Sequence, residues 1–557
     1  MILRLCLVGL VGLAALPGRI LAQVNVLTAN GDNNRTNANL HESYLTPQSF
    51  GPQSFGKLGS FPVDGQIYAQ PLYVSNLSFP NGTVHNVLFI ATMHNTVYAY
   101  DADMPSIAGL FWQVNLGQPF PTSLWNAAYT DISPEVGILA TGAIDLNAGV
   151  LYVVAESRQD STAVFSLHAL DLLRGTERMN GPVVITAQAS GSGAGSVGGV
   201  TPFDPRQHLQ RPGLLLCNGA VYVAFGSHMD QRPWHGWVMT YDASDLSAQR
   251  GVFLTTQNGE GGAIWQSGRG LAADDAGSVY SMTGNGDFDG AGDFGESFLK
   301  LSGASAALAD WFTPAIWKTL TDVDADLSTG PALIPGTHNI VGGDKYGQLY
   351  LINGDAMGKL DPSDTESSPI FSGAVIGGMF NFALWCRLGT TYVYVQGYQD
   401  VVKAYQISGA QFNPTPVSSG LTPVAAPRVG MTISANGVRN GILWETTGDF
   451  TSPSVPGTLH AFDAMNLSNE LWNSSQNPAE DNLGGFAKFV NPTVVNGKVY
   501  VATSSGAVVV YGSVCSNGAQ SPAPVCPHCP APGVPPRVAN KCLTGQASSR
   551  PVAPVRN

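Results

Sequence analysis

The chain has 557 residues, of which 44% are hydrophobic and only 12% charged, with 65 glycines and 37 prolines. This composition supplies many short strands and turns and argues against a long helical bundle with a solvated, charged surface. The formal net charge of −13 argues against nucleic acid as a partner, because phosphate recognition needs a concentrated basic surface and the 26 lysines and arginines are scattered.

Residues 1–22 form a predicted signal peptide. Arg4 precedes an apolar run from Leu5 to Leu16, and a cleavage site after Ala22 would leave Gln23 as the first residue of the mature chain. The apolar run is too short to cross a bilayer of about 30 Å, and no later segment offers an uninterrupted apolar span. We therefore expect a protein without a membrane span that is secreted, or periplasmic in a bacterial host.

Five Asn-x-Ser/Thr sequons follow, and they are candidate glycosylation acceptors in a host that glycosylates. Their asparagines are Asn34, Asn76, Asn81, Asn466 and Asn473.

One short pattern recurs eight times between about residue 66 and residue 512: an apolar strand, a turn built on Gly, Asn or Asp, and a second apolar strand that usually closes on Asp. Such repetition at roughly 50–70 residues, in four-stranded units, predicts an all-β, eight-bladed β-propeller. Each blade buries a face against its neighbours, so residues 23–512 are expected to form one large domain, sufficient as a monomer. An early strand around residues 68–74 is expected to join the last blade or to complete the first.

The repeats resemble those of a known family. Val97-Tyr-Ala-Tyr-Asp101, Val238-Met-Thr-Tyr-Asp242 and Gly497-Lys-Val-Tyr-Val-Ala502 are similar to the repeats of the pyrroloquinoline-quinone (PQQ) enzymes, the quinoprotein alcohol dehydrogenase-like propellers. Non-catalytic scaffold proteins carry repeats of this kind too. The repeats therefore predict a fold rather than an activity.

Two segments resemble the floor and the metal site of that family. Gly261-Gly-Ala-Ile-Trp265, followed by Val279 to Gly286, is similar to the stretch in which a tryptophan underlies the quinone and an asparagine binds calcium. The resemblance implies these roles for Trp265 and Asn285. The alternatives are packing between blades for Trp265 and a hairpin turn at Asn285-Gly286.

Two further segments resemble the catalytic part of the family's site. Thr321 to Asp326 is similar to the Trp-Asp-Tyr-Asp segment, which implies that Asp324 is the catalytic base and a calcium ligand, with Asp326 beside it. Gly343-Asp-Lys-Tyr-Gly347 is similar to the Asp-Arg-Asn-Gly turn, which places Lys345 at the quinone carbonyls. Both aspartates could instead cap a helix or occupy a loop, and Lys345 could be an ordinary turn residue.

The chain departs from the family pattern in several places. Where the family has a glutamate as a calcium ligand, only Asp230 is nearby, in a different register, and it is the candidate for this third metal ligand. The pair of adjacent cysteines that covers the quinone in many members is absent, and Val323 stands in place of the segment's tryptophan. No Cys-x-x-Cys-His motif is present for haem attachment, so any enzyme of this type would need an external electron acceptor.

Two hypotheses follow. In the first, the protein is a secreted oxidoreductase that uses PQQ and calcium and acts on a small alcohol or sugar; an aromatic floor, cationic side chains and a hard divalent ion all favour a flat tricarboxylate quinone. A carboxylate such as that of Asp324 would remove the hydroxyl proton as the hydride leaves. In the second, the propeller is an extracellular binding or scaffold protein without a cofactor.

Two polar segments have interpretations of their own. The loop from Asp287 to Asp293 has alternating carboxylates and is either a calcium site or, by default, a solvated hairpin loop. Residues 513–557 form a Pro-rich and Cys-rich tail, expected to be largely irregular, whose cysteines favour disulfides in an exported protein over a zinc or redox motif at Cys526 and Cys529. The tail cysteines are Cys515, Cys526, Cys529 and Cys542.

Overall fold

The computed structural model describes residues 24–51, 54–125, 131–361, 367–369, 378–426, 428–452 and 454–514. The predicted signal peptide and the four tail cysteines lie outside these residues. Among the described residues, no helix is long and apolar enough to cross a membrane.

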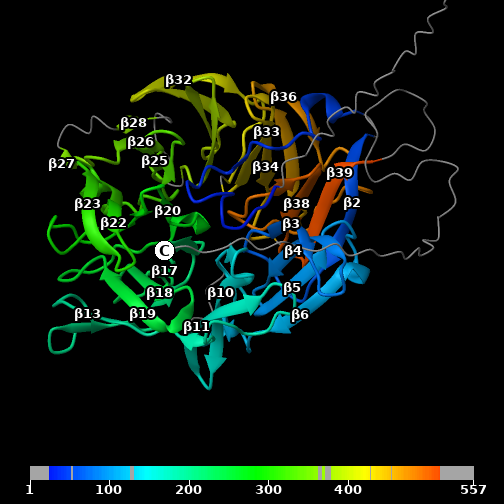
Figure 1. Ribbon diagram of the computed structural model, residues 1–557. Coiled ribbons are helices and arrows are strands. Elements are labelled where there is room, and N and C mark those ends of the chain that lie inside the picture. Colours follow the sequence, from blue (N-terminus) through cyan, green and yellow to red (C-terminus); the bar gives the residue numbers. More distant parts are fainter. Residues whose placement is uncertain are drawn as a thin grey trace, which may run out of the picture. The chain divides into compact units, whose positions relative to one another are not determined.

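The strands form an eight-bladed β-propeller, as the repeats predict (Figure 1). The blades are built mainly from antiparallel strands that follow one another in the chain, because short turns join consecutive strands. Blades 1 and 2 comprise β3 (Leu72–Ser78), β4 (Val84–Ala91), β5 (Thr96–Asp101) and β6 (Leu110–Asn115), then β9 (Ala143–Asp145), β10 (Val150–Gln159), β11 (Thr162–Asp171) and β12 (Val183–Val184).

Blade 3 has two short first strands, and blade 4 gains an extra strand that pairs in parallel at its outer edge. Blade 3 comprises β15 (His208–Leu209), β16 (Leu215–Cys217), β17 (Ala220–Ser227), β18 (Trp237–Asp242) and β19 (Asp245–Leu254). Blade 4 comprises β20 (Ala272–Ala273), β21 (Ser278–Met282), β22 (Phe298–Ser302), β23 (Ala307–Pro314) and the added β27 (Lys359–Asp361). The single described α-helix, α1 (Trp317–Asp322), lies between β23 and blade 5.

The remaining blades repeat the same order. Blades 5 and 6 comprise β24 (Ala332–Leu333), β25 (Asn339–Gly343), β26 (Gln348–Asn353) and β28 (Ser367–Pro369), then β29 (Phe382–Arg387), β30 (Thr390–Val395), β31 (Lys403–Ser408) and β32 (Gln411–Ser419). Blades 7 and 8 comprise β33 (Gly430–Asn436), β34 (Arg439–Thr447), β35 (Thr458–Asp463) and β36 (Asn466–Asn473), then β37 (Thr493–Val495), β38 (Lys498–Ala502), β39 (Ala507–Ser513) and β2 (Phe55–Pro62).

An N-terminal strand closes the ring. β2 pairs antiparallel with β39 as the outer strand of blade 8, so this blade joins a strand from near the start of the described chain to strands from near its end. The strand expected around residues 68–74 is β3, which begins at Leu72 and completes blade 1. Of the two roles expected for it, the second is therefore confirmed.

Repeated tyrosines join four of the blades to the blade that follows. Tyr152, Tyr222, Tyr394 and Tyr500 each lie on the second strand of a blade, and their hydroxyls donate to backbone carbonyls of the following blade at 2.7–3.1 Å. Each buried hydroxyl satisfied in this way contributes about 1 kcal/mol beyond the burial of its ring. The apolar-Tyr-apolar pattern of the repeats thus specifies contacts between blades as well as strands.

The segment from Val24 to His41 runs around the inside of the ring, where Figure 1 shows it in dark blue. Its backbone carbonyls accept hydrogen bonds from the first strands of successive blades: Tyr73 N donates to Val26 O, and Ile144 N to Leu27 O. The same pattern continues with Asn33, Asn34, Thr36 and Asn37, which accept from Ala273, Leu333, Leu384 and Ile433, each at 2.8 Å.

Side chains complete this circuit. Thr28 Oγ1 donates to Leu214 O in blade 3 at 3.3 Å, and Asn39 Nδ2 donates to Val494 O in blade 8 at 2.9 Å. The N-terminal segment therefore touches all eight blades. We call residues 24–41 the channel segment.

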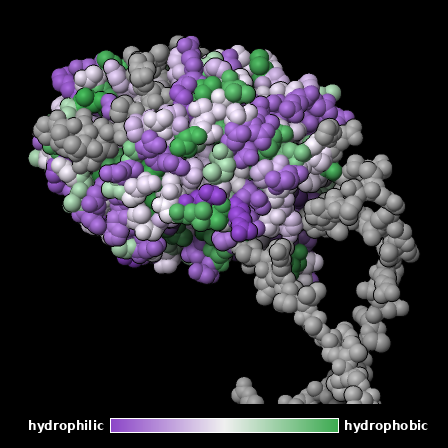
Figure 2. Space-filling model, turned by 90° about the horizontal axis from the view of Figure 1, so that it is seen from above, coloured by the Kyte–Doolittle hydropathy of each residue, from purple (hydrophilic) through white to green (hydrophobic). Residues whose placement is uncertain are grey.

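The asparagines of the predicted sequons differ in how exposed they are. Asn34 lies in the channel segment and is half-buried, whereas Asn76, Asn81 and Asn466 are exposed. The face seen in Figure 2 mixes hydrophilic and hydrophobic residues, and the exposed large hydrophobic side chains come from many blades. Glycosylation of the exposed asparagines stays a prediction.

Candidate functional site

The antiparallel blades bring two sets of loops to one end of the ring. In each blade the first strand starts where the second strand ends, so the loops before first strands and the loops after second strands share an edge. A cavity of about 550 Å³ opens at this end and is lined from blades 2 to 8. Its size falls within the range of pockets for small ligands and cofactors, about 300–1,000 Å³.

The residues chosen from the family resemblance all line this cavity. Trp265, Asn285, Asp324, Asp326, Lys345 and Asp230 come from five separate loops. Asn285 Nδ2 donates to Asp324 Oδ1 at 2.8 Å, and Lys345 Nζ donates to the same oxygen at 3.0 Å. Lys345 also forms an ion pair with Asp326. We call Asn285, Asp324, Asp326 and Lys345 the acidic wall.

Trp265 is locked against the acidic wall. It stands directly before a short 3-10 helix, η4 (Gln266–Gly268), and its indole Nε1 donates to Asp326 Oδ2 at 2.6 Å. Lys345 Nζ lies 5.3 Å from the centre of a Trp265 ring, within cation–π range. The indole is only partly buried and one side of it borders the cavity.

Local backbone geometry presents Asp324 to the cavity. α1 ends at Asp322, and Asp324 adopts a left-handed conformation with φ of 54°. An aspartate tolerates that conformation better than a branched residue, and such strain collects at functional sites. The Asp324 side chain is 66% exposed, whereas that of Asp326 is 5% exposed. Asp324 is therefore the carboxylate of the pair that a ligand can reach.

The charges of the acidic wall compensate one another. Burial by itself lowers the pKa of Lys345, but the carboxylates of Asp326 and Asp324 outweigh burial and raise the pKa above its usual value. Burial keeps the pKa of Asp326 above its usual value although Lys345 lies beside it. Lys345 thus stays cationic at neutral pH and places a fixed positive charge beside Asp324 Oδ1.

Glu296, a residue not anticipated from the sequence, lies next to the acidic wall. Its carboxyl group accepts the backbone N–H of Leu327 at 2.9 Å and the hydroxyl of Thr321 at 3.3 Å. Burial, with a further contribution from the nearby Asp326 carboxylate, raises the pKa of Glu296 well above its usual value. A neutral Glu296 therefore positions the segment that carries Asp324 and Asp326. No motif marks it, because it stands in a glycine-rich loop that reads as an ordinary turn.

Asp230, proposed as a third metal ligand, lines the same cavity on the loop between β17 and β18. Its carboxylate accepts a hydrogen bond from Ser227 Oγ. In the described part of the chain it makes no hydrogen bond to Asn285 or Asp324, whose contacts are with each other and with Lys345. The structure therefore brings Asn285 and Asp324 into contact, whereas Asp230 lines the same cavity from a loop of blade 3.

A second group of charged residues lines the cavity, and no sequence motif marks it. Arg428 and Lys488 stand in the loops before the first strands of blades 7 and 8, and Arg211 stands between the two short first strands of blade 3. Lys488 forms an ion pair with Asp131 and is almost fully buried, with 1% of its side chain exposed. We call Arg211, Arg428 and Lys488 the basic wall. Arg428 and Lys488 share a position in their blades with Trp265, which stands in the loop before the first strand of blade 4.

Three aromatic rings meet between the two walls. The centre of the Trp265 ring lies 6.1 Å from that of Phe380 and 6.1 Å from that of Phe489, and the two phenylalanines are 5.5 Å apart. These residues precede the first strands of blades 4, 6 and 8, so they converge from around the ring. They form an aromatic floor for the cavity.

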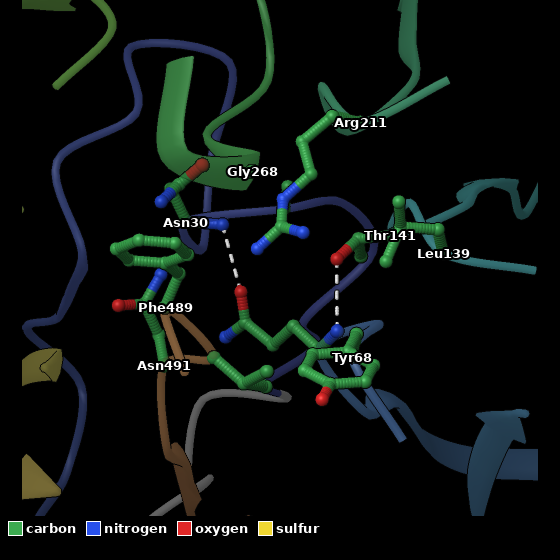
Figure 3. Close-up of a pocket in the computed structure, with 11 residues that line it drawn as sticks. Asn30, Tyr68, Leu139, Thr141, Arg211, Gly268, Phe489 and Asn491 are labelled. Carbon is green, nitrogen blue, oxygen red and sulfur yellow. Dashed lines mark hydrogen bonds between the residues drawn. The ribbon is translucent and has the colours of Figure 1, made fainter. Parts of the chain in front are cut away.

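Below this floor, a chamber of about 10 Å³ separates the cavity from the channel segment (Figure 3). Arg211 and Phe489 line both spaces. On the far side, Asn30 of the channel segment donates its backbone N–H to Gln70 Oε1 at 2.8 Å, and Gln70 N donates to Thr141 Oγ1 at 2.8 Å (Figure 3). The chamber holds at most about one water molecule, so the cavity is a closed-ended pocket.

The other polar candidates have structural roles. Asp289 Oδ1 accepts the backbone N–H groups of Ala291, Gly292 and Asp293 at 2.8–2.9 Å, which fits the hairpin-loop interpretation. Within the described ranges, no three His, Cys, Asp or Glu side chains are grouped as a metal site. Cys217 and Cys386 are free thiols, each partly buried.

No protein-family model matches the chain, and no curated protein matches it. Solved structures do match. A quinohemoprotein alcohol dehydrogenase from Pseudomonas putida HK5 is 14% identical, with a TM-score of 0.58 over 90% of this chain and 82% of that chain. A europium-containing methanol dehydrogenase is 13% identical, with a TM-score of 0.47 over 87% of this chain and 84% of that chain.

BamB from Moraxella catarrhalis is also similar, at 13% identity and a TM-score of 0.44 over 82% of this chain and 99% of that chain. The likeness to the quinohemoprotein alcohol dehydrogenase supports the propeller fold and, at 14% identity, leaves the activity open.

Proposed function

We propose that the protein is an oxidoreductase that binds a quinone such as PQQ in the axial cavity and oxidises the hydroxyl group of an alcohol or sugar. One observation carries the proposal. Trp265, Asn285, Asp324 and Lys345, chosen from four separate segments of the sequence, line a single cavity and contact one another.

The side chains present suit a planar anionic cofactor. Trp265 offers a partly open ring held in place by Asp326, and Lys345 supplies a fixed cation beside it. An open aromatic face and a fixed cation both favour the binding of a flat, electron-poor and negatively charged group. When bound, a quinone supplies the acceptor for the hydride, and hence the two electrons, that leave the carbinol carbon of the substrate.

A metal ion would have two adjacent protein ligands. The Oδ1 atom of Asn285 is buried and accepts no hydrogen bond from the described residues, and the Asp324 carboxylate lies beside it. Calcium prefers oxygen ligands of this kind. Asn285 and Asp324 would therefore hold the ion, and the assignment of Asp230 as a third ligand stays a prediction.

Asp324 acts as the general base. Its carboxylate is exposed to the cavity and has Lys345 and Asn285 as donors at one oxygen, which leaves the other oxygen free to accept the proton of a substrate hydroxyl. Loss of that proton to Asp324 accompanies loss of the hydride from carbon, so the C–O single bond becomes a carbonyl. The electrons then pass to an external acceptor.

Reconstitution tests the proposal. Purified protein is mixed with PQQ and calcium, and tryptophan quenching, thermal shift and reduction of a dye by a panel of alcohols and aldoses are measured. Trp265→Leu is expected to abolish the quenching, while Trp317→Leu, on α1 outside the cavity, retains it. Absence of any shift at saturating cofactor would refute the enzyme hypothesis.

The alternative is a binding or scaffold propeller without a cofactor. The observation that favours it is the ion pairing of Lys345 with both Asp324 and Asp326, which joins two loops as a structural salt bridge does. Under this alternative, Lys345→Met destabilises the fold and the protein binds no PQQ.

A further inference from the structure

Among the described residues, one loop of blade 3 supplies more lining residues to the cavity than any other segment. Residues 227–234 lead from the end of β17 towards β18, and four of them line the cavity: Ser227, Met229, Asp230 and Trp234. We call residues 227–234 the blade 3 loop. The proposed oxidation assigns no role to Ser227, Met229 or Trp234.

Trp234 brings a hydrogen-bond donor to the cavity. The residue is 8% exposed, and its Nε1 atom is buried and donates to no acceptor in the described part of the chain. Nearly all buried polar groups in proteins are hydrogen-bonded, because an unpaired donor costs free energy. Since Trp234 borders the cavity, an oxygen atom of a bound ligand would satisfy this donor.

Asp230 brings an acceptor. The residue is exposed, Ser227 Oγ donates to its Oδ1 atom, and Oδ2 accepts no hydrogen bond from the residues that the structure describes. Met229 and Asp230 both adopt left-handed conformations, with φ of 57° and 50°. Such conformations are costly for residues other than glycine, and they collect at functional sites. The backbone of the blade 3 loop therefore presents Asp230 instead of packing it.

The base of the loop is rigid. The neighbouring His235 is buried, its Nε2 atom donates to Ala194 O at 2.8 Å, and its Nδ1 atom is hydrogen-bonded to Thr256 Oγ1 at 2.7 Å. Trp234 O accepts the backbone N–H of Gly261 at 2.9 Å. A side chain held in this way loses little freedom when it binds a ligand.

The chemistry of the loop fits a polyhydroxylated, uncharged ligand. A hydroxyl group both donates and accepts, so neighbouring hydroxyls match the indole N–H of Trp234 and the carboxylate of Asp230. Met229 adds an adaptable apolar surface for C–H groups. An anionic ligand would be repelled by Asp230. A simple alcohol has one hydroxyl group, which the proposed base Asp324 already occupies.

We propose that the blade 3 loop is a sugar-binding subsite and that the substrate is a neutral aldose. Trp234 donates to one oxygen of the sugar, Asp230 accepts the hydrogen of a hydroxyl group, and Met229 contacts the C–H groups. This inference rests on the proposed function for the oxidation, although binding of a sugar does not require the quinone. It gives Asp230 a role different from that of the third metal ligand predicted from the sequence.

The experiment measures binding and turnover separately. Without cofactor, calorimetry gives Kd for D-glucose, D-galactose, D-mannose and D-xylose; with the PQQ-loaded protein, dye reduction gives kcat/KM for the same sugars and for 1-propanol. Trp234→Phe keeps an aromatic ring and loses the indole donor, so it is expected to raise Kd for the best-bound sugar about five- to tenfold. The ratio of kcat/KM for that sugar to kcat/KM for 1-propanol is expected to fall by a similar factor.

Two further variants accompany this substitution. Asp230→Asn changes an exposed residue, so the core stays intact, and it is expected to raise Kd for the same sugar about tenfold because a charged acceptor is lost. The affinity of the protein for calcium, measured by calorimetry, is expected to stay unchanged. Trp317→Phe, on α1 outside the cavity, is the matched control and should bind the sugar as the wild type does.

The outcomes separate the two proposals. Sugar binding that Trp234→Phe and Asp230→Asn weaken, and Trp317→Phe does not, supports the subsite. No binding of any of the four sugars, or a wild-type Kd in Trp234→Phe, overturns the subsite and leaves the quinone proposal to its own test. Sugar binding that depends on Trp234, without any binding of PQQ, supports the subsite and refutes the oxidoreductase. If Asp230→Asn weakens calcium binding and spares sugar binding, Asp230 is a metal ligand and the subsite is wrong.

Discussion

Replacing Lys488 with methionine is expected to stabilise the free protein. The side chain is 1% exposed and burial, aided by Arg211 and Arg428, lowers the pKa of Lys488 from 10.5 to about 7. Between pH 7 and pH 10.5 the unfolded chain therefore binds more protons at this residue than the folded one. Stability then rises with pH across that window, and the cost of the buried ammonium is largest at its lower end.

The size of the effect follows from the two pKa values. At pH 7 the shift costs the folded protein about 4 kcal/mol, and at pH 9 about 2 kcal/mol, because one pKa unit corresponds to about 1.4 kcal/mol. Methionine has a similar length and no charge, so the substitution removes this cost. Its stabilisation should therefore fall by about 2 kcal/mol between pH 7 and pH 9.

The assay is urea unfolding of both proteins at pH 7 and pH 9, followed by tryptophan fluorescence. Differences in packing are the same at both pH values, so the change between them isolates the ammonium group. Lys318→Met, at a lysine that is 68% exposed, is the control and should show no such change. A stabilisation that does not vary with pH, or a less stable variant at both values, would refute the charge argument that supports the basic wall.

Three further substitutions test other parts of the structure. Asp324→Asn should lower turnover in the dye assay by about 10²- to 10⁴-fold without loss of fold, and a loss below tenfold would exclude it as the base. Glu296→Gln should match the wild type in urea stability at pH 7, because burial keeps the glutamate neutral. Glu296→Ala should lower the free energy of unfolding by about 1–3 kcal/mol, and equal losses in the two variants would contradict this. Arg35→Met removes the donors to the carbonyls of Ala29 and Leu271 and should lower the free energy of unfolding by about 3 kcal/mol or more. An unchanged urea midpoint would show that the channel segment does not stabilise the fold through Arg35.

The grouping of Asn285, Asp324 and Lys345 in the cavity could be anticipated because each residue stands next to a predicted strand. Asn285 and Lys345 stand at the ends of second strands, β21 and β25, and Asp324 precedes a first strand, β24. Antiparallel order places these positions at one edge of every blade. Their mutual hydrogen bonds, and the left-handed backbone at Asp324, could be known only from the folded chain.

Arg428 and Lys488 of the basic wall, and Glu296 next to the acidic wall, could not be anticipated. Arg211, Arg428 and Lys488 occur in loops whose sequences share no motif, and an arginine in a loop is ordinarily solvated. Their meaning depends on burial and on one another, since burial, aided by Arg211 and Arg428, lowers the pKa of Lys488. Likewise, Glu296 reads as a turn residue until its contacts with Leu327 and Thr321 are seen.

The amino-acid sequence by itself determined the blades: alternating apolar strands, turns of Gly, Asn and Asp, and the repeated tyrosines are local signals, repeated often enough to specify one architecture. Only the tertiary structure decided what the ring encloses. The channel segment, the aromatic floor and the two walls join residues from many blades, and contacts of that range leave no local pattern, because each loop is constrained only by the partners that ring closure brings to it.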